Sequence, residues 1–307
     1  MTQATAIEGK QGYLFLDNDT NGSIDQFTGR LELTEATIKG WRQYLRTMEA
    51  ESAARGFTYA VSVSPAKEEL FPDMYPHERA KRTAADVFVG ELSDFTVVYH
   101  RAALRKGREF AYSKTDTHWT DYGAHVAALE VVRRWGLREA VNGLPAPAFE
   151  VIERIGDLGA KLTPMHSEIA PQFQKIGGPT AHLVYDNGIS NNGCIRVYSN
   201  AQAPIGHSLM ICGDSFGTNM ALAFARMFRR VTYLYKPASI DWDVFNIERP
   251  RYVVLQINQR FVVGQPSVAR SIFDIAHAKG PIGGEKRKLA PNDSSLQAYV
   301  EREVRSA

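Results

Sequence analysis

The sequence has almost no excess of charge of either sign. Its 307 residues include 36 Lys and Arg against 34 Asp and Glu, a formal net charge of +2, and the two signs are interspersed along the chain. A protein that binds nucleic acid or an anionic membrane surface usually carries a concentrated basic patch. We therefore expect no nucleic-acid partner, and small or neutral polar partners fit this charge better.

Cysteine and long apolar runs are scarce as well. Of the two cysteines, Cys212 lies in the apolar run 208–212, where a buried free thiol is expected, and a disulfide with Cys194 stays open but is not indicated. No stretch approaches the roughly 20 apolar residues of a membrane-spanning helix. Residues 1–12 lack the basic and apolar regions of a cleaved export signal. If Met1 is the natural start, we expect a cytoplasmic location.

The apolar residues that are present follow helical and strand patterns in turn. Thr34 is a candidate N-cap of a helix whose apolar residues recur every three or four positions until Gly56 ends it. The strand candidate 57–63 follows directly. Further strands are predicted at 12–17, 95–99, 208–212, 231–235 and 252–257, and further helices at 122–135 and 216–229. This alternation predicts an α/β domain with a mostly parallel sheet and helices on both faces.

Two segments depart from this alternation. Residues 143–206 are rich in Gly, Pro and Asn and contain short extended runs. We interpret them as a β-rich or loop insertion into the sheet and as a candidate platform for an acceptor molecule. The tail from about residue 280 is charged and rich in Gly and Lys, with a helix expected near 295–304. Residues 1–307 are expected to form a single domain that carries this insertion and this tail.

The sharpest motif is Gly213-Asp214-Ser215-Phe216, which follows the apolar strand 208–212 and precedes a helical pattern. A serine in this place lies at the carboxyl edge of the sheet. Backbone N–H groups at the start of the helix, that of Phe216 included, can stabilise an oxyanion there. Gly213 is expected to let the backbone turn sharply. The alternative is that Asp214 or Ser215 only caps the helix.

Asp116 and His118 form the second motif. A serine nucleophile needs a base, and the base needs a carboxylate that holds its tautomer. In loop backbone a carboxylate two residues away can reach one imidazole nitrogen and leave the other free. The alternatives are an ordinary loop histidine beside a helix-capping Thr120, and a metal site. No metal is predicted because no Cys or His ligand pair stands at a familiar spacing, and no phosphate-binding glycine loop indicates a cofactor.

Together the two motifs resemble those of SGNH hydrolases. Their order, with Asp-x-His-Trp upstream of Gly-Asp-Ser-Phe, is similar to the permuted order of alginate O-acetyltransferases of the AlgX and AlgJ type. The blocks 9–16, 61–67 with Phe71-Pro72, and Gln259-Arg260 are similar to further blocks of that family and stand in the same order. The resemblance covers most of the chain and implies an SGNH-like, flavodoxin-like α/β fold.

The resemblance also implies a chemistry. Ser215 would be the nucleophile that becomes acetylated, His118 the base and later the acid, and Asp116 the residue that orients His118. The leading hypothesis is transfer of an acetyl group from an unknown donor to a hydroxyl of a polysaccharide or oligosaccharide. A carbohydrate esterase that uses water is the first alternative. A catalytically silent polysaccharide-binding subunit is the alternative from another class.

Several further expectations come from the family. Its members act in the periplasm and receive acetyl groups with the help of a membrane-bound O-acyltransferase. A periplasmic location is therefore the alternative to a cytoplasmic one. Arg260 could support the site or form a salt bridge, and Gln259 stands where the family tends to have Glu, which puts a charged role there in doubt. Trp119 could stack on a sugar ring, with packing as the alternative. Lys67 could shape the pocket or be structural.

Overall fold

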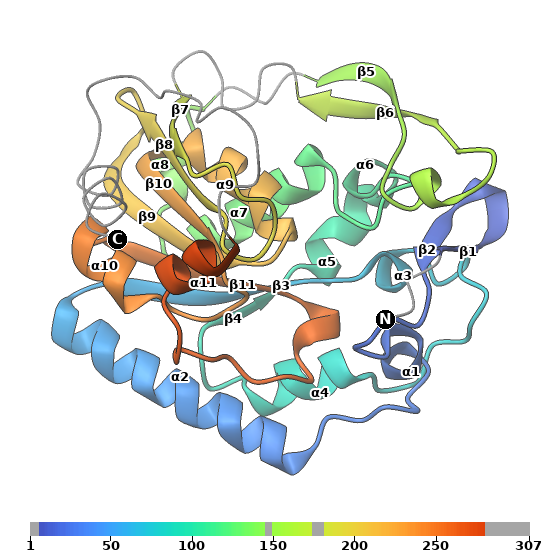
Figure 1. The fold of residues 1–307 in the computed structure, drawn as a ribbon, viewed down its shortest axis with the longest axis horizontal. Coiled ribbons are helices and arrows are strands. Elements are labelled where there is room, and N and C mark those ends of the chain that lie inside the picture. Colours follow the sequence, from blue (N-terminus) through green and yellow to red (C-terminus); the bar gives the residue numbers. More distant parts are fainter. Residues whose placement is uncertain (1–5, 145–148, 174–180, 280–307) are drawn as a thin grey trace.

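The computed structural model describes residues 6–144, 149–173 and 181–279 (Figure 1). Its centre is a seven-stranded sheet of order β4-β3-β11-β9-β10-β8-β7. The strands from β4 to β10 in this order run parallel, and β8 and β7 continue the sheet antiparallel. The predicted mostly parallel sheet is confirmed. The strands are β3 Thr58–Ser64, β4 Val97–Tyr99, β7 Ala181–Asp186, β8 Ile195–Asn200, β9 Ile205–Gly213, β10 Phe228–Tyr235 and β11 Tyr252–Asn258.

Helices cover both faces of this sheet, as predicted, because successive side chains of the central strands point to opposite sides. Met210 of β9 belongs to one apolar cluster together with Trp41 of α2. Its neighbour Ile211 belongs to the other cluster, with Ala128 of α7 and Met220 of α9. In Figure 1, α2 runs along the lower side of the molecule, with α7 and α9 across the sheet from it. The α-helices are α1 Ser23–Phe27, α2 Glu35–Arg55, α3 Lys67–Leu70, α4 Ala84–Glu91, α5 Arg101–Leu104, α6 Arg108–Ala111, α7 Asp121–Arg134, α8 Arg138–Val141, α9 Phe216–Ala225, α10 Trp242–Glu248 and α11 Ile272–Lys279.

The helix boundaries follow local capping chemistry. The side chain of Thr34 accepts a backbone hydrogen bond in the first turn of α2, and Gly56 ends that helix with a positive φ of 70°. Both predictions are confirmed. The helix expected to reach Arg229 is shorter, because α9 ends at Ala225 and Phe228 already begins β10. Strand pairing in the sheet therefore overrides the helical pattern at this end.

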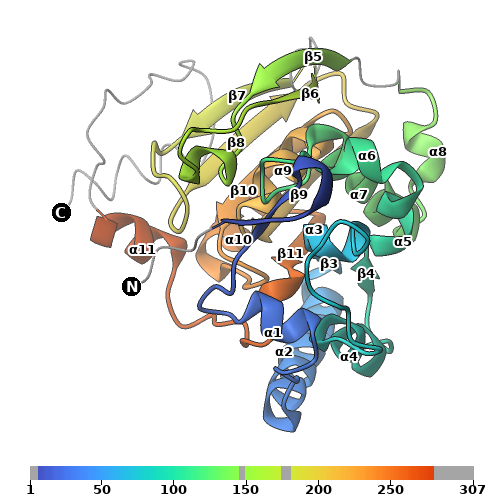
Figure 2. The ribbon, with the colours of Figure 1, turned by 90° about the vertical axis from the view of Figure 1, so that its right-hand side faces the viewer.

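The segment 143–206 contributes to two different sheets. Its first part forms a separate antiparallel hairpin of β5 (Phe149–Arg154) and β6 (Glu168–Phe173), with the 3₁₀ helix η3 (Gly159–Lys161) between the strands. Its second part, β7 and β8, belongs to the main sheet and extends it beyond β10. The segment is β-rich, as expected, but of its strands only β5 and β6 lie outside the main sheet (Figure 1). Figure 2 shows this hairpin at the top of the molecule, above α6. The division into one domain with an insertion stays a prediction.

The remaining elements lie at the start of the chain and in its loops. The strand expected at 12–17 is β2 (Leu14–Leu16), which pairs with β1 (Ala6–Glu8). The other 3₁₀ helices are η1 Lys10–Gly12, η2 Arg105–Gly107 and η4 Gln259–Phe261. The charged tail from residue 280 and the helix expected at 295–304 lie outside the described residues.

The structure tests the expectations about the two cysteines and about membrane-spanning helices. Cys194 and Cys212 are both buried and free, so the buried thiol expected at Cys212 is confirmed and no disulfide joins the pair. Among the described residues, no helix combines the length and the apolar character needed to cross a membrane.

Candidate active site

The nucleophile motif lies where β9 ends and α9 begins. Ser215 is the residue before the first turn of α9, with helical φ and ψ angles of −58° and −27°. Gly213 is not among the residues with positive φ, so the sharp turn expected there is wrong. A Cβ atom on Gly213 would stand 2.4 Å from Oε1 of Gln256. The glycine leaves room for the side chain of Gln256 from β11, and no positive φ favours it here.

Asp214 ties the nucleophile turn to β11. Its buried carboxylate accepts hydrogen bonds from the backbone N–H of Phe216 (2.9 Å), from Nε2 of Gln256 (3.0 Å) and from the backbone N–H of Asn258 (2.5 Å). Burial raises the pKa of this carboxyl group, and the hydrogen bonds act against the increase. The Phe216 amide, expected as an oxyanion donor, is therefore engaged by Asp214 in this structure.

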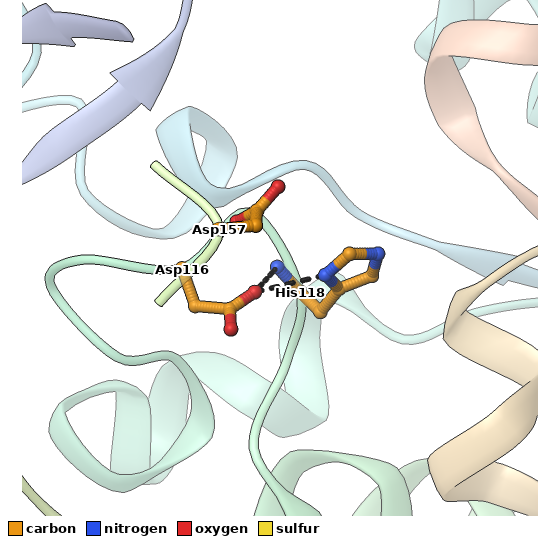
Figure 3. Close-up of side chains that lie close together, drawn as sticks. All are labelled: Asp116, His118 and Asp157. Carbon is orange, nitrogen blue, oxygen red and sulfur yellow. Dashed lines mark hydrogen bonds and ion pairs between the residues drawn. The ribbon is translucent and has the colours of Figure 1, made fainter. Parts of the chain in front are cut away.

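His118 bridges Ser215 and Asp116, as the spacing of the two motifs predicts. Its Nε2 lies 2.7 Å from Oγ of Ser215, and its Nδ1 lies 2.8 Å from Oδ1 of Asp116. The same carboxylate oxygen accepts the backbone N–H of His118 at 2.9 Å. Figure 3 shows dashed lines from one Asp116 oxygen to both of these nitrogens, with the second ring nitrogen directed away from Asp116. This arrangement can remove the hydroxyl proton of Ser215 and stabilise the resulting imidazolium.

The electrostatics of Asp116 keep it ionised. Burial acts to raise the pKa of this carboxyl group, but the hydrogen bonds and charges of His118 and Arg154 act against it, and the net pKa is strongly lowered. Arg154, in β5, donates from Nη2 to Oδ2 of Asp116 at 2.5 Å. Asp116 is therefore a carboxylate at neutral pH, as an orienting partner of an imidazole must be.

The loop that carries Asp116 and His118 is held by a further carboxylate. Asp157 accepts the backbone N–H of Thr117 at 2.6 Å and its hydroxyl at 2.8 Å. Ligand atoms of Asp116, His118 and Asp157 lie within 4.8 Å of one another, a grouping that could hold a metal ion (Figure 3). Each of the four carboxylate oxygens already accepts a hydrogen bond from the protein. We therefore interpret the group as a hydrogen-bonded loop support.

The other residues expected at the site have mainly structural contacts. Trp119 is buried, and its Nε1 donates to the backbone carbonyl of Phe216 at 3.0 Å, which favours the packing alternative over sugar stacking. Gln259 is buried and accepts the hydroxyl of Tyr99 at 2.6 Å. The guanidinium of Arg260 lies 4.7 Å from the ring centroid of Phe261.

Arg260 also lies beside a small cavity next to the site. Its Nε is 3.7 Å from Oδ2 of Asp19, and it lines the cavity together with Asn258, Phe216 and Thr117. Lys67 borders the same cavity, but its ammonium donates to the backbone carbonyls of residues 14 and 114. Arg260 therefore lies beside the site and near Asp19, which leaves both of its expected roles open, whereas the contacts of Lys67 are structural.

Two features near the site are not apparent from the sequence motifs. Tyr235, at the end of β10, is paired in register with Gly213. Burial raises the pKa of Tyr235, and hydrogen bonding to the side chain and backbone of Ser215 acts against this increase, so its hydroxyl lies next to the nucleophile. Arg154 lies in β5, within the segment 143–206 that was expected to be an acceptor platform. The sequence signal for Tyr235 is its position as a polar residue at the end of the strand next to β9, because functional groups gather at the carboxyl ends of such strands.

A second Ser–His–acid chain lies inside the core. His100 is 2.8 Å from Oγ of Ser62 through Nε2 and 2.7 Å from Oε2 of Glu130 through Nδ1. Ser62 and His100 have no exposed surface. No substrate can reach this serine, so the chain is structural.

A known protein family matches most of this chain. The family described as "SGNH hydrolase-like domain, acetyltransferase AlgX" matches residues 6–231, well over half of the chain. The chain belongs to this family. The expected membership and the expected SGNH-like fold are thereby confirmed.

Individual relatives of this AlgX-family chain are distant. It is 24% identical over 232 residues to a probable alginate O-acetylase AlgJ of Pseudomonas fluorescens, a match of 69% of this chain and 53% of that protein. The chain thus spans about half the length of the curated relatives it matches. The O-acetyltransferase domain of Pseudomonas putida AlgJ superposes with a TM-score of 0.55 at 15% identity, over 90% of this chain and 100% of that one. Bacillus cereus PatB1 gives 0.60 at 12% identity, over 86% and 98%. At such identities the superpositions show the fold alone.

The relatives correct one expectation. AlgJ and AlgX are periplasmic, alginate-modifying proteins, which contradicts the cytoplasmic location expected from residues 1–12. The composition of residues 1–12 therefore does not assign a compartment.

Proposed function

We propose that this chain is a polysaccharide O-acetyltransferase that works through an acetyl-Ser215 intermediate. The observation that carries the proposal is the contact of His118 with both Ser215 and Asp116 at the carboxyl edge of the sheet. The acetyltransferase description of the family supports it. The names of the curated relatives favour alginate or a similar polysaccharide as the acceptor.

The first half of the reaction forms the acetyl-enzyme. Nε2 of His118 takes the hydroxyl proton as Oγ of Ser215 attacks the carbonyl carbon of an acetyl ester or thioester donor. The tetrahedral intermediate collapses, the bond to the donor oxygen or sulfur breaks, and the imidazolium returns the proton to that leaving group. We further propose that a membrane-bound O-acyltransferase supplies this donor, as the family resemblance implies.

The second half transfers the acetyl group. A sugar hydroxyl attacks the carbonyl carbon of acetyl-Ser215 while His118 takes its proton, and Oγ of Ser215 leaves and regains a proton from His118. Asp116 stabilises the imidazolium in both halves. The side chain of His118 is 26% exposed, so a hydroxyl can approach it from solvent. Water in place of the sugar would make the same site an esterase.

The test is acetyl transfer by the purified chain. We expect an alginate oligosaccharide to accelerate consumption of p-nitrophenyl acetate and to gain the mass of acetyl groups, while a peptide containing Ser215 carries one acetyl group transiently. Both signals should vanish in Ser215→Ala. Steady deacetylation of acetylated glycans, with no acetyl gained by neutral or uronate-containing glycans, would favour the esterase. Equal activity of wild type and Ser215→Ala would leave only a binding function.

A further inference from the structure

The β5–β6 hairpin reaches the loop of Asp116 through charged side chains. Arg154, the last residue of β5, donates to Oδ2 of Asp116 at 2.5 Å. Glu168 stands directly opposite Arg154 in the hairpin register. Its carboxylate accepts the backbone N–H groups of Lys114 (2.6 Å) and Thr115 (3.0 Å). The hairpin thus binds both the backbone of this loop and the Asp116 carboxylate that contacts His118.

The two oxygens of Asp116 have different partners. Oδ1 faces the backbone and ring nitrogens of His118, and Oδ2 faces Arg154. With both oxygens bound, the carboxylate cannot rotate without losing a charge-assisted hydrogen bond. The side chain of Asp116 is 11% exposed and that of Arg154 is 30% exposed, so the carboxylate is the more shielded partner of this contact.

We propose that Arg154 is a positioning residue for the acetyl transfer: it holds the Asp116 carboxylate in the orientation that His118 needs and offsets part of its charge. The proposal rests on the function proposed above. It adds to that function a residue outside both sequence motifs that fixes the orientation and the charge environment of Asp116.

Several charged groups surround Asp116 and His118. Arg154 comes from β5, Asp157 from the loop after it, Glu168 from β6 and Lys67 from α3; Tyr235 of β10 faces Ser215. Asp157 and Glu168 direct their carboxylates at backbone N–H groups of the loop. The ammonium of Lys67 is bound to two backbone carbonyls. Arg154 is therefore the cation among these groups whose hydrogen bond goes to the Asp116 carboxylate itself.

Removal of the guanidinium should change the pH dependence of the reaction. In Arg154→Met no guanidinium offsets the negative charge of Asp116, whose other oxygen faces the ring of His118. The acid limb of the kcat profile should then move upward by about half a pH unit or more. Looser orientation should lower kcat about tenfold, and KM should change little because Arg154 acts through Asp116.

The experiment measures kcat and KM for p-nitrophenyl acetate between acid and neutral pH in wild type, Arg154→Met and Arg154→Lys. Lysine keeps the charge but not the planar fork, so its acid limb should stay at the wild-type position while kcat is intermediate. Lys161→Met removes an equal charge from the exposed surface of the same insertion and should behave as wild type. Thermal unfolding of each variant checks folding.

An unmoved acid limb in a folded Arg154→Met variant would overturn the proposal, as would equal losses in the Met and Lys variants without a shift. If Arg154→Met does not fold, Arg154→Gln keeps a hydrogen-bond donor without the charge and should show the shift. Activity that survives in Ser215→Ala would instead overturn the proposed function, so the two failures are distinguishable.

Discussion

At the scale of single residues, access to the serine separates the two Ser–His–acid chains. Both have histidine nitrogens within 2.8 Å of a serine hydroxyl and of a carboxylate. Ser62 and His100 are fully buried between the sheet and α7, whereas the side chain of His118 is 26% exposed. Hydrogen-bond geometry is thus necessary for a nucleophile, but a path for the substrate decides which serine can use it.

This difference predicts opposite results for the two serines. Ser215→Ala and His118→Ala should each lower turnover of p-nitrophenyl acetate at least about a thousandfold, and the double variant should be little worse, because the two residues act as a unit. Ser62→Ala is the matched control. It should cost about 1–3 kcal/mol of stability, because it leaves a buried imidazole nitrogen without its partner, and should leave activity within a few fold. Additive losses in the double variant would argue against a shared step.

At the scale of elements, the loop of residues 114–118 depends on the close approach of the segment after β5. The backbone N–H groups of Leu158 and Gly159 donate to the carbonyl of Thr115 at 3.0 and 2.9 Å. At Gly156 a Cβ atom would stand 2.2 Å from the Thr115 carbonyl oxygen and 2.6 Å from the backbone nitrogen of Asp116. Backbone packs against backbone here, so a side chain at this position must displace the loop.

Gly156→Ala should therefore weaken both folding and catalysis. We expect a loss of about 1–3 kcal/mol of unfolding free energy from overpacking and a fall of about tenfold or more in kcat, because Asp116 moves with the loop. Gly206→Ala in β9, where a Cβ atom would meet nothing within 4 Å, should change stability by less than about 0.5 kcal/mol. Urea unfolding and ester hydrolysis measure the two effects. Normal activity in a folded Gly156→Ala variant would contradict this account of the loop.

At the scale of the whole molecule, one buried cation links the first strands to the site. Lys67 is buried and donates to the carbonyls of Leu14 in β2 (2.7 Å) and Lys114 (3.0 Å). Burial lowers the pKa of Lys67 from 10.5 to about 8, although neighbouring carboxylates such as Asp116 act against the decrease. The charged ammonium thus costs folding free energy, and its hydrogen bonds recover part of this cost.

The lowered pKa of Lys67 predicts how stability depends on pH. Between about 8 and 10.5 the unfolded chain binds this proton and the folded chain does not, so the contribution of Lys67 to stability rises with pH through this window. Relative to Lys67→Met, wild type should gain on the order of 2 kcal/mol from pH 7 to pH 10. The exposed Lys106→Met serves as the control and should show a pH-independent difference. A constant difference for Lys67→Met in urea unfolding would contradict the lowered pKa.

Features encoded over short stretches of chain were predictable from the sequence. The caps Thr34 and Gly56 bound α2 as expected, because capping depends on a few neighbouring residues. The alternation of helices and strands indicated the parallel sheet, and the two motifs indicated that His118 would bridge Ser215 and Asp116. The contact of His118 with Asp116 spans only two residues. Ser215 comes close to His118 because it lies at the carboxyl edge of the sheet.

Only the tertiary structure decided which distant residues complete the site. Arg154 reaches Asp116 from 38 residues away, and Asp157 reaches Thr117 from 40, through a hairpin whose path no local pattern specifies. The engagement of the Phe216 amide by Asp214 also depends on β11 holding that carboxylate in place. The physical reason is that periodicity and capping act within a few residues. Contacts between distant side chains depend instead on which segments the complete fold places next to each other.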